Sequence, residues 1–110
     1  MRILRPSKAV FVTDELERDF YSMKENDEIR MYIKRAIQDI QKNAFCGVQL
    51  PKRIIPKEYI LKYRATNLWK YDLPDGWRLI YTITTPNKVE ILAVILEWFD
   101  HKNYERRFGY

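Results

Sequence analysis

The stretch that decides the fold is LWKYDLPDGWRLIYTIT, residues 68–84. Its two halves, 68–73 and 77–84, are rich in aromatic and aliphatic residues and flank a Pro-Asp-Gly sequence. Proline presets the first turn position, and aspartate and glycine tolerate the backbone angles that follow, so the stretch predicts a β-hairpin. A three-residue loop at that point places Asp72 directly across the hairpin from Arg78.

Two further segments extend the predicted sheet. After a second turn, residues 89–98 carry apolar side chains without two-residue alternation, which is typical of a central strand covered on both faces. The hairpin and this segment therefore form a three-stranded meander. Near the N-terminus, residues 9–12 are β-branched and aromatic and predict one more short strand.

Two amphipathic helices are predicted between the first strand and the hairpin. Asp14 and Glu17 resemble a capping box and begin the shorter helix, whereas Asn26-Asp27 begins a longer one whose apolar stripe ends near Gly47. The sequence thus predicts an α+β domain over residues 1–110, in which the two N-terminal helices pack on one face of an antiparallel sheet of about four strands.

The two faces of the predicted hairpin differ in polarity. One face carries the side chains expected to bury against the helices, namely Trp69, Tyr71, Leu73, Trp77, Leu79, Tyr81 and Ile83. The opposite face is expected to be a polar surface, with Lys70, Asp72, Arg78, Ile80, Thr82 and Thr84. The basic segment that precedes the hairpin, residues 51–65, is interpreted as a loop with one helical turn at 56–63.

Composition excludes several classes of protein. One cysteine and one histidine provide neither an intrachain disulfide nor a structural zinc site. A single cysteine suits a reducing compartment, so we expect a cytoplasmic protein. The longest aliphatic run, residues 91–96, is far too short to span a bilayer, so no membrane segment is expected. No glycine-rich phosphate loop and no serine-hydrolase motif is present, and no small-molecule cofactor is expected.

The net charge of +5 is distributed unevenly along the chain. Residues 14–42 hold six basic and eight acidic side chains, whereas the remainder holds fourteen basic and seven acidic ones. Cations from Lys52 to Lys70 and in the C-terminal tail alternate with rings, namely Tyr59, Tyr63, Trp69, Tyr104 and Phe108. Cations that neutralise phosphates, combined with rings that stack on bases, are typical of a surface for single-stranded RNA.

Two segments carry a resemblance to a known family. The sequence GWRLIY at 76–81, followed by a hydrophobic strand and then DHKNY at 100–104, resembles the RelE/ParE superfamily of toxins from toxin-antitoxin pairs. The resemblance implies a strand, a helical hairpin and an antiparallel sheet. It also implies a RelE-like activity, an endoribonuclease (mRNA interferase) that cuts messenger RNA on the ribosome and is neutralised by a cognate antitoxin protein.

The resemblance also implies roles for particular residues. Arg78 is similar to the strand arginine that contacts the scissile phosphate in RelE-like toxins, and Lys70 corresponds to a cation on the preceding strand. His101, Lys102 and Tyr104 correspond to the basic or histidine residue and the tyrosine that follow the last strand. The chain departs from active members by carrying Tyr71-Asp72 where several lysines or arginines are common.

The chemistry that the resemblance implies needs no metal. Attack by the RNA 2′-hydroxyl requires a general base, a general acid and fixed positive charge around the phosphate. Arg78 would hold the phosphate with Lys70 adding charge, His101 would act as the acid or the base, and Tyr104 would stack on a base or orient the RNA. The cations expected to bind RNA are Lys62, Arg64, Lys102, Arg106 and Arg107.

The same residues support a second interpretation. Arg78 could be a structural cation paired with Asp72, and a lone histidine after a strand is most often a cap or a solvated side chain. The alternative function is a binding protein without nuclease activity, either a ParE-like gyrase inhibitor or a degenerate toxin that binds RNA or an antitoxin and cuts nothing.

Overall fold

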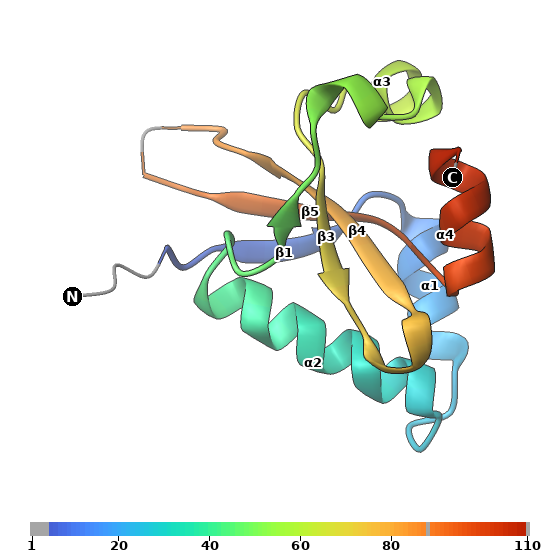
Figure 1. Ribbon diagram of the computed structural model, residues 1–110. Coiled ribbons are helices and arrows are strands. Elements are labelled where there is room, and N and C mark those ends of the chain that lie inside the picture. The colour runs from blue at the N-terminus through green and yellow to red at the C-terminus, as the bar shows by residue number, and fades with distance from the viewer. Residues whose placement is uncertain (1–4, 88, 110) are drawn as a thin grey trace.

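The computed structural model describes residues 5–87 and 89–109, in which five strands form one mixed sheet and four helices flank it (Figure 1). The strands are β1 (Lys8–Phe11), β2 (Val48–Gln49), β3 (Trp69–Asp72), β4 (Arg78–Thr84) and β5 (Leu92–Phe99). The helices are α1 (Asp14–Ser22), α2 (Glu28–Lys42), α3 (Lys57–Tyr63) and α4 (His101–Phe108), and short 3₁₀ turns occur at η1 (Lys52–Ile54) and η2 (Pro74–Gly76).

The strand order is β1-β5-β4-β3-β2, and it differs in part from the expected sheet. The meander β3-β4-β5 is antiparallel, and Asp72 lies opposite Arg78 as predicted. In place of an all-antiparallel sheet of about four strands, β1 pairs with β5 in parallel and β2 adds a fifth strand. Parallel neighbours require a long connection, which the chain from α1 to β4 provides. The α+β class is confirmed.

The two N-terminal helices begin at polar caps. The Thr13 side chain, and not Asp14, caps α1 by accepting a hydrogen bond of 3.1 Å from the Leu16 amide. Asp14 is instead the first helical residue, where its negative charge suits the helix N-terminus. Asp27 caps α2 as predicted, accepting from the Ile29 amide at 2.8 Å.

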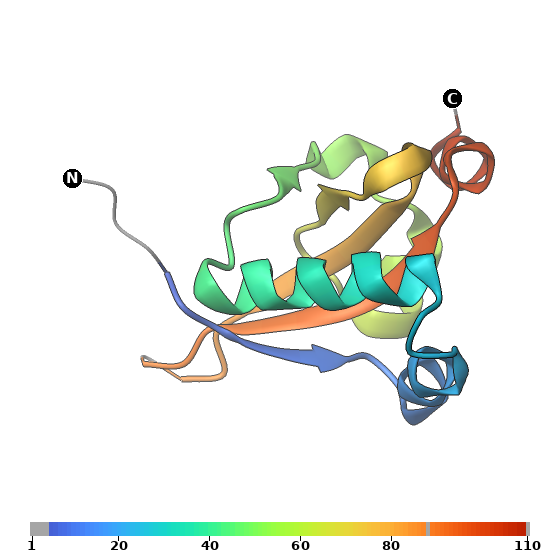
Figure 2. The ribbon, with the colours of Figure 1, turned by 90° about the horizontal axis from the view of Figure 1, so that it is seen from below.

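One core lies between α1, α2 and the sheet. Phe20 from α1 and Ile33 and Ile40 from α2 pack against the face predicted to be apolar, where Leu79 and Tyr81 are fully buried. Figure 2 shows α2 crossing this face of the sheet. The period-two assignment of this face is therefore confirmed.

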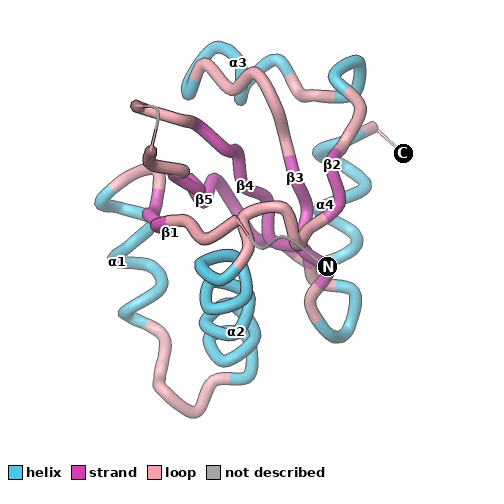
Figure 3. Tube along the Cα trace, turned by 90° about the vertical axis from the view of Figure 1, so that its left-hand side faces the viewer, coloured by secondary structure: helices cyan, strands magenta, loops and turns pink. Residues whose placement is uncertain are grey.

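The opposite face of the sheet is not the polar surface that the sequence predicts. Ile80 and Thr82 are buried there, because α3 and α4 cover this face, and Figure 3 shows α2 and α3 on opposite sides of the sheet. Tyr59 of α3 and Tyr104 of α4 supply rings to this second core. The predicted helical turn at 56–63 is confirmed as α3. The segment after β5, interpreted from the sequence as a C-terminal tail, forms the helix α4.

A buried tyrosine joins the sheet to the segment after α2. The Tyr81 hydroxyl donates to the Ala44 carbonyl at 2.8 Å and accepts from the Gly47 amide at 3.1 Å. Burial raises the pKa of Tyr81 above its ordinary value, so the neutral hydroxyl is the form that holds both backbone groups.

We expect Tyr81→Phe to lower the free energy of unfolding by about 1–3 kcal/mol, because it leaves a carbonyl and an amide without their partner. Urea unfolding followed by circular dichroism measures the change. Tyr21→Phe is the matched control: Tyr21 is exposed, and the loss expected there is below about 0.5 kcal/mol. Equal losses in the two variants would show that the Tyr81 hydrogen bonds contribute nothing measurable.

Candidate functional site

Two cations from neighbouring strands share one carboxylate oxygen at the end of the hairpin. Lys70 Nζ lies 3.2 Å from Oδ1 of Asp72, and Arg78 Nε lies 2.9 Å from the same oxygen. Strand alternation and the register of β3 and β4 place all three side chains on the face that α4 covers. The predicted pair of Asp72 and Arg78 is thus present, and Lys70 joins it.

Arg78 is held by the turn that precedes it. Its Nη1 donates to the carbonyls of Gly76 at 2.7 Å and Trp77 at 3.2 Å, and its side chain is 17% exposed. Its Nε is buried and makes no aligned hydrogen bond, so the contact with Asp72 is an ion pair only. The guanidinium is therefore fixed in position, with part of its hydrogen-bonding capacity already used by the protein.

Tyr104 covers the two cations. Its ring centre lies 5.3 Å from Cζ of Arg78 and 5.9 Å from Nζ of Lys70, within the range of cation–π attraction. The ring is buried against Phe99 and Phe108. Tyr104 is therefore part of the second core and does not present a face to solvent for base stacking.

His101 lies beside the same hairpin turn. A methyl group placed on Gly76 would be 3.2 Å from Cβ of His101, so the first residue of α4 packs over η2. The imidazole is exposed, and its Nε2 lies 2.5 Å from Oε1 of Glu105, one helical turn later. The structure thus gathers the four residues predicted to be catalytic at one end of the sheet, and it adds two carboxylates, Asp72 and Glu105, as their partners.

Arg107 is occupied within the protein, which corrects its expected role as a free contact for RNA. It lies 2.5 Å from Glu58 of α3 and donates to Glu97 of β5 at 2.9 Å, so it ties α4 to two other elements. Burial alone would lower the pKa of Arg107, but the hydrogen bond with Glu58 and the charge of Glu97 outweigh it and raise the pKa. Burial, together with a hydrogen bond donated to Glu97, raises the pKa of Tyr59 in the same cluster.

The remaining predicted RNA contacts are exposed on α3 and α4. With their neighbours they form what we call the α3–α4 face, defined by the exposed cations Lys52, Arg53, Lys57, Lys62, Arg64, Lys102 and Arg106. Arg64 ends α3 in the left-handed conformation, with φ of 53°. Both helices cover the same side of the sheet, whereas the α1–α2 side holds more acidic than basic residues.

The aromatic residues expected to alternate with these cations lie elsewhere. Tyr59 and Tyr104 are buried in the second core, and Trp69 packs against the first. The reason is that apolar side chains of η1, α3 and α4 cover a sheet face that the sequence predicts to be polar and exposed. Among residues 5–87 and 89–109, the α3–α4 face therefore offers positive charge to a phosphate backbone without the exposed Phe, Tyr or Trp rings on which single-stranded RNA stacks.

The described ranges, 5–87 and 89–109, contain neither a metal-binding cluster nor a membrane-spanning helix. Within them no group of three or more His, Cys, Asp or Glu side chains is placed to hold a metal ion. No helix in those ranges is long and apolar enough to cross a bilayer.

Comparisons with models of known families, with curated proteins and with solved structures gave no match to this chain.

Proposed function

We propose that the protein is a RelE-like toxin that acts on messenger RNA at the ribosome and is neutralised by an antitoxin. The observation that carries the proposal is the pair of cations, Lys70 and Arg78, that converge on one anionic oxygen at the end of the hairpin. The order of elements adds support: a strand, two helices and an antiparallel meander follow one another along the chain, as the resemblance implies.

The Asp72 carboxylate that Arg78 and Lys70 hold occupies the position that an RNA phosphate oxygen would take. Charge-assisted contacts of arginine and lysine with carboxylate and with phosphate have the same range of distances. The Asp72 side chain is 52% exposed, so its carboxylate can leave the cations without disturbing a core. In this proposal Asp72 competes with the RNA phosphate for Arg78 and Lys70.

The proposed reaction is attack of an RNA 2′-hydroxyl on the adjacent phosphorus. The bond to the 5′-oxygen breaks, which leaves a 2′,3′-cyclic phosphate and a 5′-hydroxyl. Arg78 and Lys70 neutralise the charge that builds on the phosphate, and His101 either removes the proton from the 2′-hydroxyl or supplies one to the departing 5′-oxygen. Glu105 acts as a positioning residue for the imidazole.

Expression from a tightly controlled promoter tests this reaction. Wild-type protein is expected to arrest growth and to cut translated transcripts, and Arg78→Ala and His101→Ala are each expected to abolish the cuts, since each removes a group that the reaction needs. Mapping of 5′ ends in total RNA measures the cuts, with Arg18→Ala on α1 as the control for general effects of losing a cation. Cuts that persist undiminished in the double variant would remove the assigned site.

A second candidate is binding without cleavage, which one observation favours. Asp72 fills the anion position and Tyr104 covers the cations above it, so the resting site is closed to a phosphate. A degenerate toxin of this kind would bind RNA and leave transcripts intact. A gyrase inhibitor on the same scaffold would instead cause DNA breaks with transcripts intact, so the same cultures separate the three outcomes.

We expect Asp72→Asn to raise the affinity for a single-stranded oligoribonucleotide about tenfold, because it removes a charge that competes for Arg78 and Lys70. Fluorescence anisotropy with a 2′-deoxy-substituted, uncleavable oligonucleotide measures the change. Asp75→Asn is the matched control, since Asp75 lies in the adjacent turn and accepts a hydrogen bond of 3.4 Å from the Tyr32 hydroxyl. Equal gains in the two variants would show that only net charge matters.

A further inference from the structure

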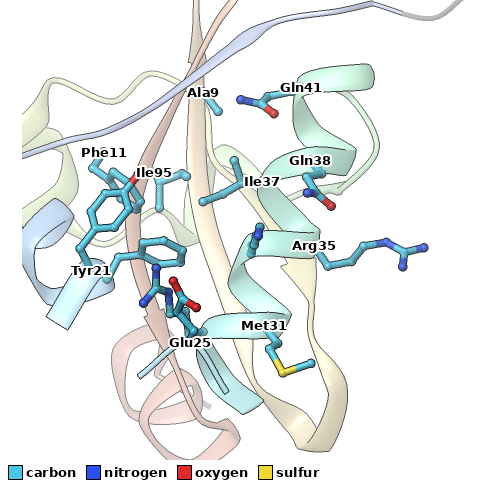
Figure 4. Close-up of a pocket in the computed structure, with 13 residues that line it drawn as sticks. Ala9, Phe11, Tyr21, Glu25, Met31, Arg35, Ile37, Gln38, Gln41 and Ile95 are labelled. Carbon is cyan, nitrogen blue, oxygen red and sulfur yellow. The ribbon is translucent and has the colours of Figure 1, made fainter. Parts of the chain in front are cut away.

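Two hollows border the helix α2. The larger is a groove beside β1, with a volume of about 880 Å³ and with Phe11 and Ile95 in its lining. The smaller has a volume of about 460 Å³ and lies between α2 and the end of the β3–η2 hairpin, and we call it the hairpin pocket. Arg35 points away from the larger hollow (Figure 4). The hairpin pocket is lined by Tyr32, Arg35, Tyr71, Asp72, Leu73 and Pro74.

Two tyrosine rings form much of the wall of the hairpin pocket. Tyr32 comes from α2 and Tyr71 from β3, and both are half-buried. Their hydroxyls are turned to carboxylates of the protein, since Tyr71 donates to Asp39 and Tyr32 donates to Asp75 at 3.4 Å. What these two residues offer to a ligand is therefore their rings. Together with the apolar side chains of the turn, such a lining suits a flat aromatic ligand.

One cation and one anion complete the lining. The Arg35 side chain is 76% exposed, and its Nε lies 3.6 Å from Oδ1 of Asp39, a loose ion pair. In Asp72, Oδ1 is the oxygen that Arg78 and Lys70 share, whereas Oδ2 lies 3.5 Å from Nζ of Lys70, at the limit of a hydrogen bond. The pocket thus offers a guanidinium as donor and a carboxylate oxygen as acceptor.

This combination of groups matches the edges of a guanine base. Guanine carries two acceptors, N7 and O6, which arginine binds through two parallel hydrogen bonds. Its next edge carries the N1–H and 2-amino donors, which a carboxylate accepts. Adenine carries an amino donor in place of O6 and would present it to the guanidinium. The lining of the hairpin pocket therefore favours guanine over adenine.

The outer edge of β3 is open beside the pocket. β2 pairs with β3 only at Trp69 and Lys70, so within residues 5–87 and 89–109 no strand lies beyond Tyr71 and Asp72 on that side. Asp72 lies at this edge, where it lines the pocket and also contacts Arg78. An RNA chain that crosses the edge can place a base in the pocket and a neighbouring phosphate at the two cations.

We propose that the hairpin pocket binds a guanine base of the RNA. The base stacks on the two tyrosine rings, accepts hydrogen bonds from Arg35 at N7 and O6, and donates from N1 and the 2-amino group to the Asp72 carboxylate. Because Asp72 then accepts from the base, it holds Lys70 and Arg78 less tightly, and a phosphate of the same RNA takes its place. The inference rests on the proposed function, which makes RNA the ligand, and it adds a preference for guanine beside the bound phosphate.

Four oligonucleotides test the base preference. Each is a uridine oligomer of about five nucleotides with G, A, C or U at its centre, made uncleavable by 2′-deoxy substitution. In fluorescence anisotropy the guanine oligomer is expected to bind about tenfold more tightly than the other three. The measurement requires no cleavage, so its outcome does not depend on whether the protein is an active nuclease.

Arg35→Ala is expected to remove this preference, so that the guanine and adenine oligomers bind equally. The matched control is Lys34→Ala, because Lys34 is the preceding residue of α2, is exposed and lies outside the hairpin pocket. Each variant loses one positive charge, so the ratio of the two affinities isolates recognition of the base. In Lys34→Ala the ratio is expected to be retained.

Two more substitutions separate stacking from hydrogen bonding. Tyr32→Leu is expected to bind the guanine oligomer about tenfold more weakly than Tyr32→Phe does, because leucine has no ring on which a base stacks. Asp72→Asn is expected to raise the affinity for every oligomer and to narrow the guanine preference, because an amide accepts through one oxygen only. A purely structural role of Asp72 would leave the preference unchanged.

A location measurement on wild-type protein does not depend on any variant. Amide chemical shifts with the guanine and adenine oligomers are expected to differ at Tyr32, Arg35 and residues 71–73, and a difference confined to α3 and α4 would overturn the inference. So would equal binding of the four oligomers, or equal loss of preference in Arg35→Ala and Lys34→Ala. Binding without base preference would overturn this inference alone, whereas no binding of any oligomer would overturn the proposed function with it.

Discussion

Neutralising four exposed cations of the α3–α4 face is expected to weaken RNA binding about a hundredfold or more at low salt, because under the proposed function each of them contacts an RNA phosphate. The variant replaces with Gln the residues Lys62, Arg64, Lys102 and Arg106, all of which are exposed. Binding of a structured RNA, measured by filter retention, is the direct test. The structure adds a specific expectation: the loss is similar for RNAs of unrelated sequence, because the described residues of this face, up to 109, include no exposed Phe, Tyr or Trp ring that could stack on bases.

The salt dependence of the same binding provides a second measurement. Loss of four phosphate contacts is expected to reduce the slope of log K against log salt concentration by roughly three. The matched control neutralises four exposed cations of the opposite side, namely Arg18, Lys24, Lys34 and Lys42. Equal losses of affinity in the two variants would mean that net charge alone governs binding. An unchanged salt slope in the first variant would show that RNA does not bind at the α3–α4 face.

Gly47→Ala is expected to lower the free energy of unfolding by about 3 kcal/mol, because an added methyl group has no space. A Cβ at this position would lie 2.6 Å from the Lys70 carbonyl oxygen and 2.7 Å from the Tyr81 hydroxyl. The first of these is backbone of β3 and the second is fully buried, so β2 would have to move off the sheet. Urea unfolding with circular dichroism measures the loss.

Two comparisons isolate this close approach. Gly109→Ala places a methyl group in open space at φ of 74°, so only backbone strain of about 1 kcal/mol is expected there. In the double variant with Tyr81→Phe one of the two clashes is gone, so the combined loss is expected to be smaller than the sum of the single losses. Strict additivity would show that the hydroxyl and the new methyl group do not meet.

The sequence predicted the elements whose patterns are local. The Pro-Asp-Gly turn established the hairpin and its register, and the pairing of Asp72 with Arg78 followed from the loop length. The apolar stripe of α2 and the period-two face of the hairpin identified the first core, because both patterns are regular over many residues. The same local pattern accounts for the four residues predicted to be catalytic. The hairpin positions two of them and the segment after β5 positions the other two.

The second core was missed because its members come from short and irregular segments. Leu50, Ile55 and Tyr59 lie among prolines and cations, where no apolar period is visible, yet they bury Ile80 and Leu96. The signal for α4 was present in Asp100, which caps the helix, and in the spacing of Tyr104 and Phe108 on one helical face. Because the pattern of these segments does not show that α3 and α4 cover the sheet, the sequence predicts a solvent-exposed hairpin face and an exposed Arg78.

The order of strands was also beyond local patterns. A parallel contact between β1 and β5 joins the first and last strands of the chain, and nothing in residues 8–11 distinguishes a parallel from an antiparallel partner. The groove beside β1 is a consequence of that placement, so it could not be predicted from the sequence either.

The unequal charge of the two sides of the sheet gives the molecule a dipole moment. A polyanion attracts the positive end, which is the α3–α4 face, before any contact forms. The protein therefore rotates during diffusion, so that α3 and α4 face the polyanion when the two meet. The groove beside β1 then points back toward solvent.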